Sequence, residues 1–135
     1  MLLYATLGTN DLDRAIAFWD PVMRLLGHDR LVEVDDGWAG WGKDYADGFG
    51  LYLCQAWNGA AAAPGNGAML AFPARDAAQV RAFHATALEH GGSDEGAPGT
   101  RPYYQPGFYV AYVRDPDGNK LACVFPTYDP DTDIG

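Results

Sequence analysis

Aromatic and polar side chains crowd one short stretch near the C-terminal end of the sequence. Residues 101–109 contain Arg101, Tyr103, Tyr104, Gln105 and Tyr109. A guanidinium can hold a carboxylate or enolate oxygen, and a phenol can donate a proton as a general acid. One chemistry open to this stretch therefore uses Tyr104 or Tyr109 as an acid, with Arg101 stabilising an oxyanion. The alternative is a structural loop whose tyrosines anchor it to a sheet edge.

The sequence contains few histidine, cysteine and serine side chains, which are the usual metal ligands and nucleophiles. The three histidines are His28, His84 and His90. Their spacing matches no metal-binding pattern, so we interpret them as surface or helix-end residues. Cys54 and Cys123 lie in apolar runs, which indicates buried free thiols rather than a disulfide framework or a zinc site. Ser93 is the only serine and lies in a polar loop, and the sequence contains neither a nucleophile–base pair nor a phosphate-binding loop.

Composition bounds the class of protein. The chain has 135 residues, 48% of them hydrophobic, which is typical of one globular domain. Its formal net charge of -9 argues against nucleic acid and anionic membranes as partners. No apolar run reaches the roughly 20 residues of a membrane helix, and the start lacks the basic region of a signal peptide. We therefore expect a cytoplasmic protein.

The first half of the sequence predicts a strand, a helix and then further strands. The expected strands are 3–8, 30–35, 38–42 and 49–57, and the expected helix is 12–27. Thr9, Asn10 and Asp11 offer side-chain oxygens that can cap the helix start. Pro21 cannot donate a backbone hydrogen bond, so we expect a kink or a break there. Turns are predicted at Gly37 and at residues 47–48.

After a small-residue connector at 58–66, the same order of elements begins again. The expected strands are 68–73, 108–114 and 119–126. Between the first two, Asp76 can cap a helix that carries Val80, Phe83, Ala87 and Leu88 on one face and ends at Gly91 and Gly92. The last two strands are joined by the turn 115–118, whose sequence is Asp-Pro-Asp-Gly. The tail 127–135 is acidic and is expected to be frayed.

The two halves share the order strand–helix–strands with a period of about 65 residues. We therefore predict a single domain at 1–126, built from one module at about 1–57 and a second at about 67–126. Neither half has enough strands to cover its own apolar face, so the two modules should pack together. The predicted fold is α+β, with the helices on one side of a curved mixed sheet.

The sequence also resembles a known superfamily. The carrying segments, in chain order, are 6–19, 65–72, 83–84, 96–109 and 115–119. They are similar to those of the vicinal oxygen chelate superfamily, which holds glyoxalases, bleomycin resistance proteins and extradiol dioxygenases. The likeness is greatest to short bacterial glyoxalase-like proteins. The resemblance implies two βαβββ modules whose sheets form a cup, with a divalent metal at its floor.

The resemblance places the metal ligands at Tyr4, Tyr52, Met69 and Ala122. Relatives usually carry His or Gln at the first-strand positions and Glu at the last-strand positions. Tyrosine ligates metals only occasionally, a thioether prefers soft ions, and alanine has no donor. We therefore expect that the metal site is lost and that the protein has no cofactor. The four side chains either line an apolar, aromatic pocket or fill the cup by packing against each other.

These observations lead to competing hypotheses. The first is a protein that binds a small organic molecule in the cup without a metal, through Tyr4, Tyr52, Met69, Ala122 and the loop residues 101–109. The second is a lactoylglutathione lyase-like or dioxygenase-related enzyme, which requires the metal. The third is the metal-free acid chemistry described above. Trp38, Trp41 and Trp57 suit a core or an interface, and family members commonly form dimers, so a homodimer is expected.

Overall fold

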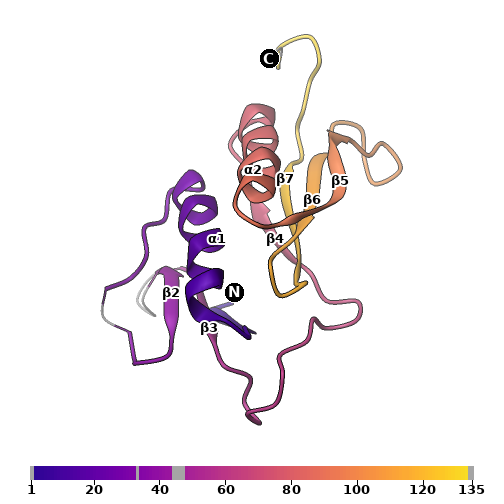
Figure 1. The fold of residues 1–135 in the computed structure, drawn as a ribbon. Helices are drawn as coiled ribbons and strands as arrows, with labels where there is room; N and C mark the ends of the chain where they lie inside the picture. The colour runs from indigo at the N-terminus through magenta and orange to yellow at the C-terminus, as the bar shows by residue number, and fades with distance from the viewer. Residues whose placement is uncertain (1, 33, 44–47, 134–135) are drawn as a thin grey trace.

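The computed structural model describes residues 2–32, 34–43 and 48–133 (Figure 1). The elements, in chain order, are β1 (Tyr4–Gly8), α1 (Leu12–Leu25), β2 (Ala39–Gly42), β3 (Gly50–Cys54), β4 (Leu70–Pro73), α2 (Ala77–Glu89), β5 (Ser93–Thr100), β6 (Tyr109–Arg114) and β7 (Lys120–Phe125). The predicted α+β class is confirmed.

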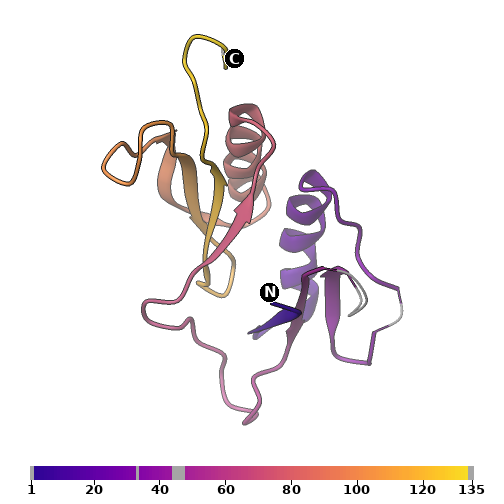
Figure 2. The ribbon, with the colours of Figure 1, turned by 180° about the vertical axis from the view of Figure 1, so that it is seen from behind.

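The strands form two separate mixed sheets. The first has the order β1-β3-β2 and the second the order β4-β7-β6-β5. In each, the strand that precedes the helix pairs in parallel with the last strand of the same half, and the remaining pairs are antiparallel. Both β1 and β4 consequently lie at a sheet edge. Figure 2 shows the two sheets on either side of the molecule, joined by the long connector between β3 and β4.

Each sheet has one face packed against the helices and one face turned away from them, which we call the open face. Along β3, Leu51 and Leu53 belong to the same buried cluster as the inward side chains of α1. Because successive strand residues alternate between faces, Tyr52 lies on the open face. The parallel register pairs Thr6 with Tyr52 and Tyr4 with Gly50, so both β1 residues share that face.

The two halves share one core, and α1 is the element that joins them. The fully buried ring of Trp19 packs against Trp41 of β2 and Phe72 of β4. Its Nε1–H donates to Asp115 in the turn between β6 and β7, over 3.2 Å. At the start of the helix, Arg14 forms an ion pair with Asp117 in the same turn, over 2.9 Å. The first half is thereby fixed to the second through both burial and hydrogen bonding.

Of the kink or break predicted at Pro21, the break is wrong, because α1 continues through this residue. It runs from Leu12 to Leu25, with Asp11 capping its first turn by accepting from the Arg14 backbone N–H. Proline removes one helical hydrogen bond. However, the residues on both sides of this proline include three that are completely buried, namely Phe18, Trp19 and Val22. The apolar area buried by this stretch outweighs the missing bond.

The predicted strand at 30–35 is wrong for the residues that the structure describes. Only Arg30 bridges to β2, and the Leu31 N–H donates to the Gly40 carbonyl over 2.8 Å. Pairing stops there because Val32 is 93% exposed and so gains no burial from a continued ladder. Within the described part of the first half, the sheet has three strands instead of the expected four. The predicted turn at Asp47 lies outside the described residues.

The strand β5 was not predicted. Its sequence, from Ser93 to Thr100, is rich in glycine and contains Pro98, and its residues are mostly exposed. It lies at the edge of the second sheet and pairs with β6 through two register shifts. Edge strands tolerate proline and bulges, and their stability comes from the neighbouring strand rather than from an apolar pattern of their own. Ser93 therefore lies in a strand rather than in a loop.

The second helix and the tail depart from the prediction in smaller ways. Asp76 caps α2 as expected, but Leu88 is 41% exposed and does not belong to the buried face. The start of the tail is packed instead of frayed. The Tyr128 ring lies 4.7 Å from that of Tyr109, centroid to centroid, and the Tyr128 N–H donates to the Gly107 carbonyl. The tail is thus attached to the loop that precedes β6.

Candidate functional site

The open face of the second sheet brings small and polar-tipped side chains together. The register pairs Ala122 of β7 with Tyr112 of β6 and with Ala71 of β4, so these three residues lie in one row. Ala122 is completely buried, whereas Ala71 is exposed and Tyr112 is half-buried. Tyr112 ends the row on the β6 side, and Ala71, on the edge strand β4, presents its methyl group at the other end.

Tyr112 lies between two cations. The Arg101 guanidinium carbon is 5.7 Å from the centroid of its ring, and the Lys120 ammonium is 5.1 Å from the same centroid. Burial, followed by the neighbouring Tyr104 phenol, raises the pKa of Tyr112, and Arg101 opposes that rise. The phenol is therefore protonated at neutral pH, and it can donate a hydrogen bond to a ligand.

Of the predicted loop residues, Arg101, Tyr103 and Tyr104 lie near Tyr112. Two of the loop side chains donate hydrogen bonds to backbone carbonyls of the chain. Arg101 donates to the Ala97 carbonyl over 2.9 Å and to the Thr100 carbonyl over 3.3 Å. Gln105 donates to the Pro126 carbonyl over 2.9 Å. The exposed rings of Tyr103 and Tyr104 lie 4.6 Å apart. The structure thus brings Arg101 and Tyr104 to the site, and it places Gln105 in an anchoring contact.

Tyr109 is separated from these residues. It lies three positions before Tyr112 on β6, so its side chain is on the opposite face of the sheet. There it belongs to the buried core, and its hydroxyl accepts from Arg81 of α2 over 3.3 Å. The prediction that grouped Tyr109 with Arg101 and Tyr104 is therefore not supported by the position of its side chain.

Tyr4 and Tyr52 lie together on the open face of the first sheet. Their rings meet edge to face, with centroids 5.8 Å apart. The Tyr52 ring lies flat over two glycines, because a Cβ added at Gly40 would be 2.7 Å from it and one added at Gly50 would be 3.1 Å from it. Only 5% of Tyr52 is exposed, against 48% of Tyr4. Tyr52 is therefore largely a packing residue, and Tyr4 presents its ring to the outside.

Met69 is placed differently from the other predicted site residues. It immediately precedes β4, is 44% exposed and lines a hollow of about 480 Å³ with Arg114, Lys120 and the end of the connector. The four positions that the resemblance assigns to a metal therefore offer two phenols, one thioether and a buried methyl group. This donor set does not fit a hard divalent cation. Among the described residues, no three His, Cys, Asp or Glu side chains lie close enough to hold one.

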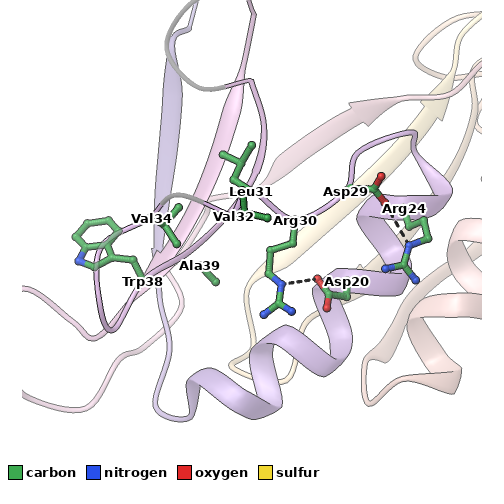
Figure 3. A pocket seen from close by; sticks show the side chains of 9 residues that line it. All are labelled: Asp20, Arg24, Asp29, Arg30, Leu31, Val32, Val34, Trp38 and Ala39. Atoms are coloured by element: carbon green, nitrogen blue, oxygen red, sulfur yellow. Dashed lines mark hydrogen bonds and ion pairs between the residues drawn. The ribbon is translucent and has the colours of Figure 1, made fainter.

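A larger hollow, of about 500 Å³, lies on the helix side of the first sheet. Figure 3 shows its wall of Leu31, Val34 and Trp38. Facing it are two ion pairs, Arg30 with Asp20 and Arg24 with Asp29, each 3.4 Å long. Both guanidinium groups already face a carboxylate, so the hollow has no unbalanced charge with which to select a ligand. The open face of the second sheet is the stronger candidate site.

Tyr112 and Lys120 were missed from the sequence. The signal that could have found them is the alternation of the two last strands. Tyr112 is in phase with Val110 and Arg114, and Lys120 is in phase with Ala122. Since Ala122 was already assigned to the open face, its partner Tyr112 and its neighbour Lys120 follow from the register.

Comparison with known proteins agrees with this fold. The sequence matches the Glyoxalase/Bleomycin resistance protein/Dioxygenase superfamily over residues 2–123. The chain belongs to this superfamily. A glyoxalase/bleomycin resistance protein from Albidiferax ferrireducens is 31% identical, with a TM-score of 0.80 over 92% of this chain and 97% of that one. No curated protein matches the chain.

More distant members of the superfamily share the fold. A glyoxalase-related enzyme from Fulvimarina pelagi is 22% identical, with a TM-score of 0.73 over 100% of this chain and 95% of that one. The lactoylglutathione lyase from Agrobacterium tumefaciens is also 22% identical, with a TM-score of 0.62 over 92% of each chain.

Neither helix that the structure describes has the length and apolarity needed to cross a bilayer.

Proposed function

We propose that this member of the superfamily binds a small organic molecule on the open faces of its sheets, chiefly the second, without a divalent metal. The observation that carries the proposal is the Tyr112 side chain on the open face, whose ring has both Arg101 and Lys120 close to it and which shares a row of the sheet with the exposed Ala71. A mostly apolar surface with a few convergent polar groups is the usual form of a small-molecule site. The donor set at Tyr4, Tyr52, Met69 and Ala122 supports binding without the metal.

Thermal unfolding of the purified protein tests the proposal. A panel of small aromatic and aliphatic compounds is screened for a rise in Tm, because a ligand that binds only the folded state stabilises it. At a concentration of about 100 times Kd, the stabilisation is about 2.7 kcal/mol. Tyr112→Ala should remove the rise, whereas Val32→Ala, a change at an exposed side chain on the helix side of the first sheet, should keep it. A panel without any stabilising compound, or a rise that persists in Tyr112→Ala, would refute the proposal.

A lactoylglutathione lyase-like or dioxygenase-related activity is the alternative, and it is supported by membership of the superfamily. It requires a metal at or near positions that provide few suitable donors. Metal analysis of the purified protein, combined with turnover of methylglyoxal and glutathione, separates the two. Bound metal at one ion per chain with turnover would favour the lyase. Metal-free protein that still binds a ligand would favour the proposal above.

A metal-free reaction is a further possibility at the same surface. Tyr104 adjoins Tyr112, and Arg101 lies over the same ring, so a phenolic acid and a guanidinium are close together. If the bound molecule is also turned over, Arg101→Ala should lower kcat more than it raises KM. Unchanged turnover in that variant would exclude an oxyanion role for Arg101.

The proposal also includes a homodimer in the cytoplasm. Exposed apolar side chains support the dimer, since Leu2, Val32 and Trp57 are 62%, 93% and 102% exposed. Cys54 and Cys123 are both free thiols, which suits a reducing compartment. Light scattering of the purified protein measures the mass directly, and a monomer of 14.6 kDa at all concentrations would refute the dimer.

A further inference from the structure

One end of the open face of the second sheet carries a positive charge that no acidic side chain among the described residues neutralises. The hollow of about 480 Å³ there is lined by Arg114, Lys120 and the connector from Pro64 to Met69. Lys120 and Arg114 form the β6–β7 register pair nearest the turn between these strands. Their side chains therefore project from the same face of the sheet. The hollow is therefore lined by two cations from the sheet and by connector residues that carry no charge.

The two cations differ in how far the protein neutralises them. The charge of Arg114 is balanced by Glu95, whose carboxylate accepts from its Nε–H over 2.7 Å. The Nη1–H of Arg114 also donates to the Gly118 carbonyl over 2.8 Å. Lys120 has no carboxylate or carbonyl hydrogen-bond partner among the described residues, and its ammonium lies over the ring of Tyr112. Among the described residues that line this hollow, Lys120 is therefore the cation whose charge no acidic side chain balances.

We propose that the Lys120 ammonium binds the carboxylate of the ligand, so that the small molecule of this site is an organic monoanion. This inference rests on the proposed function and specifies its ligand class. Within the hollow, the one charge that remains on Lys120 balances one carboxylate, whereas Arg101 lies outside the lining and donates to two backbone carbonyls. A phosphate dianion fits less well, because the Glu95 carboxylate on Arg114 would repel a second negative charge and leave it uncompensated.

The surroundings of Lys120 place the rest of such a ligand. Lys120 contacts Tyr112, and Tyr112 is the register partner of Ala122. Met69 lines the same hollow and is exposed. A carboxylate on Lys120 therefore leaves the apolar part of the molecule close to the Tyr112 ring and the Met69 side chain. The phenol of Tyr112 can then donate to a second oxygen further along the ligand.

The test compares acids with neutral molecules of the same shape. Benzoate and phenylacetate, their neutral amides benzamide and phenylacetamide, and inorganic phosphate are titrated into the isotope-labelled full chain and followed by amide chemical shifts. The acids should shift the amides of residues 112 and 120 and bind about ten- to hundredfold more tightly than the amides. Phosphate should bind more weakly than the acids, and tighter binding of phosphate would overturn the choice of a carboxylate.

The chain offers a matched control, because Lys43 and Lys120 are its only lysines. Lys120→Gln should weaken the acids by about tenfold or more and leave the amides unchanged. Lys120→Arg should retain most of the affinity, and Lys43→Gln, an exposed position in the other half, should retain all of it. Equal binding of acids and amides, or unchanged acid binding in Lys120→Gln, would overturn this inference and leave the proposed function intact. Failure of both acids and amides to bind would count against both.

Discussion

Asp115 is the side chain on which the junction between the two halves depends most. Its Oδ2 accepts from Trp19 Nε1 and Asn119 Nδ2, and its Oδ1 accepts from the backbone N–H groups of Asp117 and Asn119. All four contacts are 2.8–3.2 Å long. Every partner is a donor, so the residue must accept at both oxygens. Asp115→Asn keeps the shape of the side chain and replaces one acceptor by a donor.

The cost of Asp115→Asn can be worked out from these contacts. The new NH2 group must face two donors, whichever way the amide is oriented. Asn119 can reverse its own side-chain amide and accept, but the indole of Trp19 is fully buried and cannot turn to water. A buried donor without a partner costs about 1–3 kcal/mol, and a strained or lost second contact adds to it, so we expect a loss of about 2–4 kcal/mol. For a chain of this size, the fall in Tm is about 10 °C.

Urea unfolding followed by circular dichroism measures this loss. The exposed, charge-matched change Asp131→Asn is the control and should cost less than about 0.5 kcal/mol. In a Trp19→Phe background, Asp115→Asn should cost about 1–2 kcal/mol less, because the indole donor is already gone. The reasoning is refuted if Asp115→Asn is no more destabilising than Asp131→Asn. It is also refuted if the two buried changes are additive.

Two further predictions concern titrating groups. Burial raises the pKa of Cys123 to about 12 and raises that of Cys54 less strongly. Iodoacetamide at pH 8 should therefore label Cys54 first, and Cys123 only after unfolding. Mass spectrometry that finds Cys123 labelled in the folded chain would contradict this prediction. The hydrogen bond from His84, followed by the Gly96 N–H, holds the pKa of Asp94 below 3.8. The stability from Asp94 is therefore fully present above pH 3.8 and is lost as pH falls through the lower folded value. A titration by carbon NMR should show the pKa returning toward 3.8 in His84→Ala, and an unchanged value would contradict the role of His84.

Local chemistry made the helices and the last turn predictable. Asp11 and Asp76 cap the two helices as their side chains suggest, each accepting from the backbone N–H three residues later. In the turn that joins β6 and β7, Gly118 has a φ of +89°, a conformation that glycine adopts without strain. These features depend on residues close together in sequence, so the sequence alone carries enough information to locate them.

The elements that were missed or wrongly expected depend on neighbours distant in sequence. The strand β5 has no apolar alternation and exists because β6 provides its hydrogen-bond partners. The segment after Leu31 has strand-forming residues but obtains no burial for Val32. Whether each segment forms a strand depends on its pairing partner, and the local sequence pattern does not identify that partner.

The candidate site was predictable in part. Arg101 and Tyr104 were expected near it, and the structure places both beside Tyr112. Alternation along the strand could also have shown that Tyr109 and Tyr112 point to opposite faces, since they are an odd number of positions apart. To place Lys120 near the Tyr112 ring, alternation must be combined with the register of β6 and β7, in which Tyr112 pairs with Ala122.

The contact between Trp19 and Asp115 has a consequence for how the chain is made. The two residues are 96 positions apart. At a synthesis rate of about 5–20 residues per second, the helix α1 exists for roughly 5–20 s before its partner turn leaves the ribosome. During that interval the large apolar rings of α1 lack the second half of their core. We therefore expect the nascent first half to expose apolar surface of the kind that chaperones bind, until the second half has been synthesised.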